Sequence, residues 1–146
     1  MTSPELENLA RVGALTRTPP DAAEIAALVH SGEARLADAA NGTLSLESRF
    51  DLAYNAAHAL SLAALRRLGY RAEHRYTVFQ VLPHTLDVEP GVWRLLIKCH
   101  GLRNQAEYEG MIDLDERIVT DLVKATRAVR AALLRQAMTF EGGAPS

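Results

Sequence analysis

The spacing of apolar residues along the chain predicts an almost entirely helical protein. Apolar side chains recur every three or four residues, the period of an α-helix, in segments separated by turn-forming residues. The predicted helices are residues 4–13, 22–40, 45–68, 90–110 and 113–138. The chain contains no internal repeat and no domain boundary, so we expect one all-α domain over residues 1–146, an up-and-down bundle of four to five helices.

Residues with known capping preferences mark the ends of these segments. The sequence pattern Ser-Pro-Glu at the first predicted helix is typical of a helix start. Starts are predicted at Ser3, at Asp21, at Ser45 and at either Asp113 or Asp115, and stops at Gly13, Gly42, Gly69 and Gly110. Within the second predicted helix, Ser31-Gly32 interrupts the apolar pattern.

Two stretches of the chain have a less regular pattern. Residues 70–89 contain apolar side chains that fit either a short helix or a strand, and Pro83 limits both. We expect a short helix inside a long crossover there. Residues 141–146 are mostly small, so we expect a disordered tail after a core that spans about residues 21–139.

The third predicted helix has apolar residues on nearly all of its sides. Between Leu52 and Leu65 it presents no continuous polar face. A helix of this kind is packed on both sides. In a small bundle the second side is most simply another subunit, so we expect a homodimer.

The composition of the chain is that of an ordinary globular protein. It has 146 residues, with 48% hydrophobic and 23% charged residues and a formal net charge of −2. Because there is no basic excess and no block of Lys and Arg, broad electrostatic capture of a nucleic-acid backbone is not expected. A small, local phosphate site remains compatible with this charge.

The single cysteine and the N-terminal sequence predict a cytoplasmic protein. Cys99 has no partner within the chain for a disulfide, which fits a reducing compartment, and its place on the apolar side of a helix predicts a buried core residue. The N-terminal residues do not resemble a signal peptide, and no apolar run approaches the roughly 18 residues needed to span a membrane.

Charged and polar residues continue an apolar stripe near the end of the fourth long predicted helix. At roughly 100° per residue, His100, Arg103, Asn104, Glu107 and Tyr108 share one broad face. Charged groups on a buried stripe are costly unless they are paired. One interpretation is structural: an Arg103–Glu107 ion pair and an Asn104–Tyr108 contact lock this helix in place.

The other interpretation of this stripe is functional. Arg103 would present its guanidinium to a phosphate in a cleft, with Asn104 and Tyr108 orienting it. A twofold axis would duplicate the stripe and give a composite pocket with two arginines.

A second polar set lies on the third predicted helix. Asp51, Asn55 and His58 are spaced by four and three residues, so they share a face, and Tyr54 lies beside them. Asp51 and His58 could bind a metal, but the Glu-x-x-His pairs of di-iron bundles are missing. We therefore expect a satisfied hydrogen-bond set between helices, no metal and no cofactor. The sequence also lacks a Gly-x-Ser-x-Gly motif and a phosphate-binding glycine-rich loop.

Two sequence motifs resemble those of HEPN domains (higher eukaryotes and prokaryotes nucleotide-binding). Residues 102–108, Leu-Arg-Asn-Gln-Ala-Glu-Tyr, resemble the family's signature region, and residues 50–60 look like its second core helix. The resemblance covers roughly residues 44–134 and implies a HEPN-like up-and-down bundle that forms a dimer. It also implies a metal-independent RNase of a toxin–antitoxin or defence system, or an inactive member that binds nucleotides, RNA or a protein. A partner of the nucleotidyltransferase type is a further implication.

The catalytic motif of the family is Arg, four to six residues, then His. Arg103 matches the arginine and Asn104 the polar residue that often follows it, but Tyr108 stands four residues after Asn104 and no histidine occurs after His100. We therefore expect a catalytically degenerate protein that binds a nucleotide, RNA or a protein partner through an Arg103 cleft. One alternative is a metal-independent endoribonuclease that uses Arg103, with His100 or His58 as proton carrier. Another is a purely structural dimerisation domain. The predicted binding residues are Asp51, Tyr54, His58, Arg103, Asn104, Glu107 and Tyr108.

Overall fold

The computed structural model describes residues 3–110 and 113–143, with side chains up to residue 138, and is mostly helical. Its helices are α1 (Pro4–Arg11), α2 (Ala22–Ala39), α3 (Leu46–Arg67), α4 (Arg75–Gln80), α5 (Leu82–Thr85), α6 (Pro90–Glu109) and α7 (Glu116–Gly143). Two short strands, β1 (Thr16–Arg17) and β2 (Tyr70–Arg71), pair antiparallel. The prediction of a helical protein is confirmed, and the small two-stranded sheet was not predicted.

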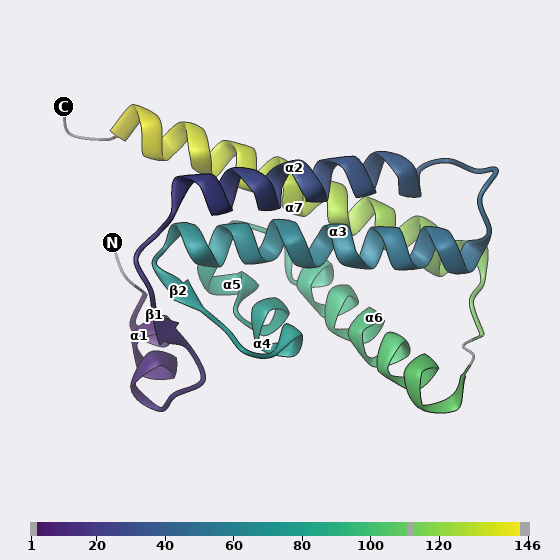
Figure 1. The fold of residues 1–146 in the computed structure, drawn as a ribbon, viewed down its shortest axis with the longest axis horizontal. Helices are drawn as coiled ribbons and strands as arrows, with labels where there is room; N and C mark the ends of the chain where they lie inside the picture. Colours follow the sequence, from purple (N-terminus) through teal and green to yellow (C-terminus); the bar gives the residue numbers. More distant parts are fainter. Residues whose placement is uncertain (1–2, 111–112, 144–146) are drawn as a thin grey trace.

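The long helices α2, α3, α6 and α7 reverse direction one after another along the chain (Figure 1). Helices α2, α3 and α7 lie side by side, and α6 leans away from α3 toward its own C-terminal end. The short helices α4 and α5 fill the space between α3 and α6. None of the described helices is long and apolar enough to cross a membrane.

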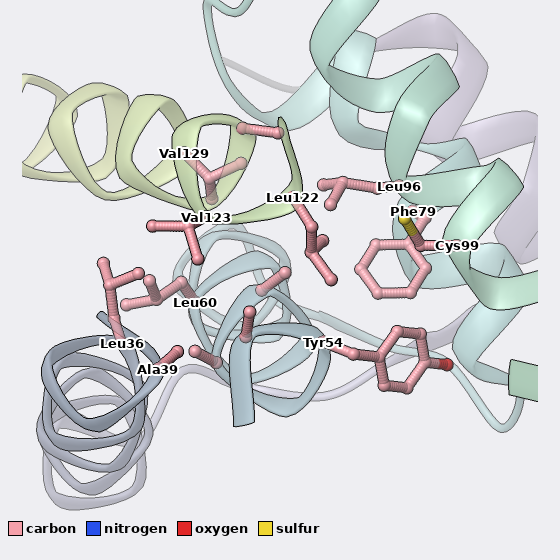
Figure 2. Close-up of a cluster of buried hydrophobic side chains, with 14 of the residues drawn as sticks. Leu36, Ala39, Tyr54, Leu60, Phe79, Leu96, Cys99, Leu122, Val123 and Val129 are labelled. Carbon is pink, nitrogen blue, oxygen red and sulfur yellow. The ribbon is translucent and has the colours of Figure 1, made fainter. Parts of the chain in front are cut away.

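Helix α3 is the centre of the main hydrophobic core, and other parts of the same chain cover it. Figure 2 shows side chains from α2, α4, α6 and α7 converging on α3. Its inward-facing alanines, among them Ala53, Ala56 and Ala63, are fully buried and let neighbouring helices approach closely. The apolar character of α3 on all sides is thus explained within one chain. The inference from this helix to a second subunit was wrong, and the homodimer stays a prediction on other grounds.

Helix α2 continues through Ser31-Gly32, as the single helix predicted over residues 22–40 required, and Gly32 is a contact point between helices. A Cβ atom at this position would lie 2.6 Å from Leu60 Cγ and 3.3 Å from the Ala56 carbonyl oxygen on α3. Leu60 is fully buried, so its side chain has no space to move away from an added Cβ atom. The glycine therefore permits the close approach of α2 to α3.

Substituting two helical glycines with alanine should have opposite effects on stability. We expect Gly32→Ala to lower the free energy of unfolding by about 1 to 2 kcal/mol, since overpacking against Leu60 outweighs the gain in helix propensity. At Gly101, in α6, an added Cβ atom would meet no described atom within 4 Å, and Gly101→Ala should raise stability by about 0.5 to 1 kcal/mol. Urea unfolding of both variants measures this, and a stabilised Gly32→Ala variant would contradict the prediction.

A second, smaller core joins the N-terminal segment to the C-terminal end of α3. Leu6 and Leu15 are buried there against Leu65 and Tyr70. The predicted core began at about residue 21, so the structure extends it toward the N-terminus. The first helix was predicted, but its packing against the end of α3 depends on long-range contacts that the local pattern does not show.

Most predicted helix ends agree with the structure. Asp21 accepts hydrogen bonds from the backbone N–H groups of the first turn of α2, and Ser45 accepts one from Ser48. Asp115 rather than Asp113 caps α7, through the N–H of Ile118. Gly13, Gly69 and Gly110 each follow a helix with a φ angle between +79° and +91°.

The expected short helix is α4, which ends at Gln80, before Pro83 as predicted; Pro83 then lies in the first turn of α5, where proline needs no N–H partner. One predicted boundary was wrong. Helix α7 continues to Gly143, beyond the predicted end at residue 138 and into the predicted tail, because no capping residue ends its hydrogen-bond ladder earlier. Residues 144–146 of that tail lie outside the described residues.

Candidate functional site

Three elements bring polar side chains together where α6 begins to diverge from α3. Helix α3 contributes Asp51 and Tyr54, which its period of 3.6 residues places on neighbouring faces. Helix α6 contributes His100 and Arg103, one turn apart. The short helix α4 adds Arg75, which sequence reasoning did not single out. We call the surface formed by these residues and by Asn104 the Arg75–Arg103 site.

Arg103 is held in place on the α3 side of this site. Its guanidinium pairs with the Asp51 carboxylate and lies 3.8 Å from Glu107 Oε1, as the predicted ion pair along α6 required. The guanidinium carbon is also 5.1 Å from the centre of the Tyr54 ring, a cation–π distance. Its side chain is 27% exposed. Arg103 is thus held in position before any ligand binds, and one edge of its guanidinium is accessible to solvent.

Arg75 approaches the same tyrosine ring from α4. Its guanidinium carbon lies 5.6 Å from the Tyr54 centroid, and Nη1 donates a hydrogen bond of 3.1 Å to Asn55 Oδ1. Within residues 3–110 and 113–138, no carboxylate forms an ion pair with Arg75. Its charge therefore meets two uncharged groups, the Asn55 amide and the Tyr54 ring. Arg75 was missed because the sequence predicted a short helix in residues 70–89 but not which helices it packs against.

His100 is hydrogen-bonded through both of its ring nitrogens. Nδ1 lies 2.9 Å from the Tyr54 hydroxyl, and Nε2 lies 3.1 Å from the Asn104 amide nitrogen. Burial lowers the pKa of His100, and the positive charge of Arg75 acts in the same direction. The imidazole is therefore neutral at pH 7, which lets Nε2 accept the hydrogen bond from Asn104.

His58 lies one turn along α3 from Tyr54 and packs with its ring 6.0 Å from that of Phe79. Burial lowers the pKa of His58 to about 4, with smaller contributions from Arg75 and His100. At neutral pH it carries no extra proton that it could donate as an acid. Tyr54, with its ring against Phe79 (Figure 2), is buried as well, and burial raises its phenol pKa.

The remaining predicted residues are more peripheral. Tyr108 is 94% exposed, and Glu107 reaches the site only through Arg103. The expected contact between Asn104 and Tyr108 was wrong, because the Asn104 amide turns back one helical turn to His100. Tyr108 lies near the end of α6 that diverges from α3, which leaves its ring in solvent.

A cavity of about 160 Å³ adjoins Arg103 on the side away from α4. Glu47 and Asp51 from α3 and Ala106 from α6 line it together with Arg103. The cavity therefore has two carboxylates on the α3 side and the Arg103 guanidinium beside Ala106 on the α6 side. A ligand that reaches the guanidinium from this direction would meet two carboxylates.

Apart from the carboxylates of Asp51 and Glu107, which pair with Arg103, the groups at the site are cationic or neutral. Two guanidinium groups, a neutral imidazole, a phenol and an amide can donate hydrogen bonds to an anion or stack on a flat group. Nowhere in the described part of the chain are three or more His, Cys, Asp or Glu side chains grouped as metal ligands would be. Compared with known proteins, the chain matches no family model, no curated protein and no solved structure.

Proposed function

We propose that this chain is a HEPN-like protein that binds a phosphate-bearing ligand, a nucleotide or an RNA, at the Arg75–Arg103 site. The observation that carries the proposal is the convergence of two arginines from separate elements on the ring of Tyr54. Arg103 is neutralised by a carboxylate, whereas Arg75 has none among the described side chains. Because Arg103 is already ion-paired with Asp51 and Glu107, the positive charge available to a phosphate is that of Arg75.

The two arginines have different roles in this proposal. Arg103 is oriented by Asp51, so it offers its remaining N–H groups in a defined direction. Arg75 supplies the charge that a phosphate would neutralise, because its partner Asn55 is uncharged. Guanidinium groups bind phosphate through paired N–H donors, so a single phosphate within reach of both would be held strongly.

The resemblance to HEPN domains extends the proposal beyond the site. A homodimer, a partner of the nucleotidyltransferase type and a place in a toxin–antitoxin or defence system all follow from that resemblance. The lack of a histidine after Arg103 in the motif supports binding over efficient cleavage.

Metal-independent RNA cleavage is the second candidate function, and the position of His100 favours it. A neutral imidazole beside Arg103 could accept the proton of a ribose 2′-hydroxyl, while the guanidinium stabilises the charge that develops on the phosphate. Both ring nitrogens are already hydrogen-bonded, so Asn104 or Tyr54 would have to release one of them. Because cleavage requires this release and binding does not, we rank RNA cleavage behind ligand binding.

The test is binding of a fluorescently labelled single-stranded RNA in EDTA, followed by anisotropy for the wild type and for Arg75→Ala, Arg103→Ala and Arg94→Ala. Arg94 lies on the opposite side of α6, about 180° from Arg103, and its loss changes the net charge equally. We expect Kd to rise by about tenfold or more in the first two variants, the cost of a charged hydrogen bond. The Arg94→Ala control should change it by about twofold at most, as one screened surface charge does.

Three results of this experiment would change the conclusion. Equal weakening by all three substitutions would mean nonspecific charge attraction and would overturn the proposal. Loss of stability in Arg103→Ala, with no RNA bound by the wild type, would favour the structural role. Shortening of the RNA by wild type but not by Arg103→Ala, seen on a gel of the same samples, would make the chain an endoribonuclease.

A further inference from the structure

Tyr76 stands directly after Arg75 in α4, at the outer edge of the Arg75–Arg103 site. Its side chain is 44% exposed. On its inner side the ring contacts His100, with 5.9 Å between ring centres and 53° between ring planes. The tyrosine is thus fixed by the histidine on one side and open to solvent on another.

An aromatic ring beside a guanidinium is the arrangement that recognises an unpaired nucleotide. A flat side chain offers a surface on which any base can stack, and an adjacent cation holds the phosphate. Arg75 lies against Tyr54 and Tyr76 against His100, and the ring centres of Tyr54 and His100 are 6.3 Å apart, so the cation and the exposed ring border the same cluster. A paired base cannot use such a ring, because its faces are already covered by its neighbours in the duplex.

We propose that Tyr76 stacks on an unpaired nucleobase whose phosphate is bound by Arg75 and Arg103. This inference rests on the proposed function and adds to it which part of the ligand is recognised. The base would come either from a free nucleotide or from a single strand of RNA, since the chemistry is the same. Tyr76 would then distinguish single strands from duplexes without reading the base sequence.

The contact with His100 prepares the tyrosine for this role. A side chain that is already packed on one side loses less conformational freedom when a base stacks on its other side. His100 is itself held by Tyr54 and Asn104, so the ring of Tyr76 rests on a rigid support. This contact does not depend on a change in the protonation of His100, because its imidazole is neutral at pH 7.

The experiment compares strands that differ only in their bases. The probes are a labelled oligoadenylate of about eight nucleotides, a ribose–phosphate strand of equal length without bases, and the oligoadenylate paired with its complement. For the wild type we expect the oligoadenylate to bind about tenfold more tightly than the strand without bases, and more tightly than the duplex. In Tyr76→Ala this preference should disappear, whereas Tyr76→Phe, which keeps the ring, should retain it.

The outcomes separate this inference from the function on which it rests. Equal binding of all three probes, lost in Arg103→Ala, would overturn base stacking and leave phosphate binding intact. No binding of any probe would overturn both. A preference that survives in Tyr76→Ala would assign the stacking to another residue and overturn the role of Tyr76. Tyr76 is 44% exposed, so Tyr76→Ala leaves the hydrophobic core intact and the variant can be compared with the wild type.

Competition with AMP identifies the source of the base. Displacement of the oligoadenylate by AMP at a concentration near the Kd of the strand would assign the site to a free nucleotide. Displacement only at much higher concentrations would assign it to an RNA strand, which contacts more of the surface than one nucleotide can. Both results are compatible with stacking on Tyr76, which the loss of the base preference in Tyr76→Ala tests.

Discussion

Replacing Arg66 with methionine is expected to lower the free energy of unfolding by about 3 to 5 kcal/mol. Arg66 lies near the C-terminal end of α3, and its side chain is 1% exposed. Methionine has a similar length but offers neither a charge nor N–H donors. The substitution therefore removes hydrogen bonds without opening a large cavity.

The expected loss follows from the partners of this arginine. Nε donates to Glu24 Oε1 on α2 at 2.6 Å, and the two Nη groups donate to the backbone carbonyls of Thr18, Pro19 and Tyr70. These carbonyls belong to the segments that join the N-terminal core to the main one. Without Arg66 they would be left without a donor where water reaches them poorly, which is the costly part of losing a buried polar side chain.

Arg71→Met is the matched control for this measurement. Arg71 binds the other oxygen of the same carboxylate, Glu24 Oε2, at 2.7 Å, but its side chain is 45% exposed. A solvent-exposed ion pair contributes little, so its loss should cost about 1 kcal/mol or less. Urea unfolding of both variants decides the matter: similar losses for the two would mean that the charge pair, and not the buried backbone contacts of Arg66, carries the stability.

Acidification below pH 6.5 should destabilise the protein because of His58. In the folded chain the pKa of His58 is about 4, whereas in the unfolded chain it returns to about 6.5. The unfolded state therefore binds a proton first as the pH falls. The contribution of the neutral His58 to the free energy of unfolding is fully present above pH 6.5. It is lost progressively between pH 6.5 and 4, at about 1.4 kcal/mol for each pH unit. By pH 5 the loss due to this residue is about 2 kcal/mol.

The variant His58→Gln separates this contribution from that of the carboxylates. Glutamine is neutral at both pH values, so the variant keeps every other titrating group and lacks only the imidazole. We expect the wild type to lose about 2 kcal/mol more than His58→Gln between pH 7 and pH 5, measured by urea unfolding at each pH. Parallel losses in the two proteins would show that His58 is protonated equally in the folded and unfolded states.

The same burial bears on the candidate proton carriers. A histidine whose pKa is about 4 is a weak base, so His58 would transfer protons poorly at pH 7. His100 is the better placed of the two, because it is partly exposed and lies one turn from Arg103. If RNA cleavage is observed, His100 is the residue to substitute next.

Local features of the sequence determined the helices and most of their ends. The period of the apolar residues is a property of neighbouring residues on one helix, and so are the caps at Asp21 and Ser45. Gly110 ends α6 in a left-handed conformation that glycine adopts most readily. The shared face of His100, Arg103 and Asn104 also follows from helical geometry alone. These predictions needed no knowledge of how the helices pack.

Only the tertiary structure decided which of these residues meet. Asp51 and Arg103 are 52 positions apart in the chain, and their ion pair depends on the angle at which α6 crosses α3. Arg75 enters the site from α4, the short helix expected in residues 70–89, but the local pattern did not show that α4 packs beside α3 and α6. The burial of α3 by its own chain likewise depends on long-range packing, since an apolar surface does not specify what will cover it. Periodicity tells which side of a helix is apolar, and packing alone determines its neighbour.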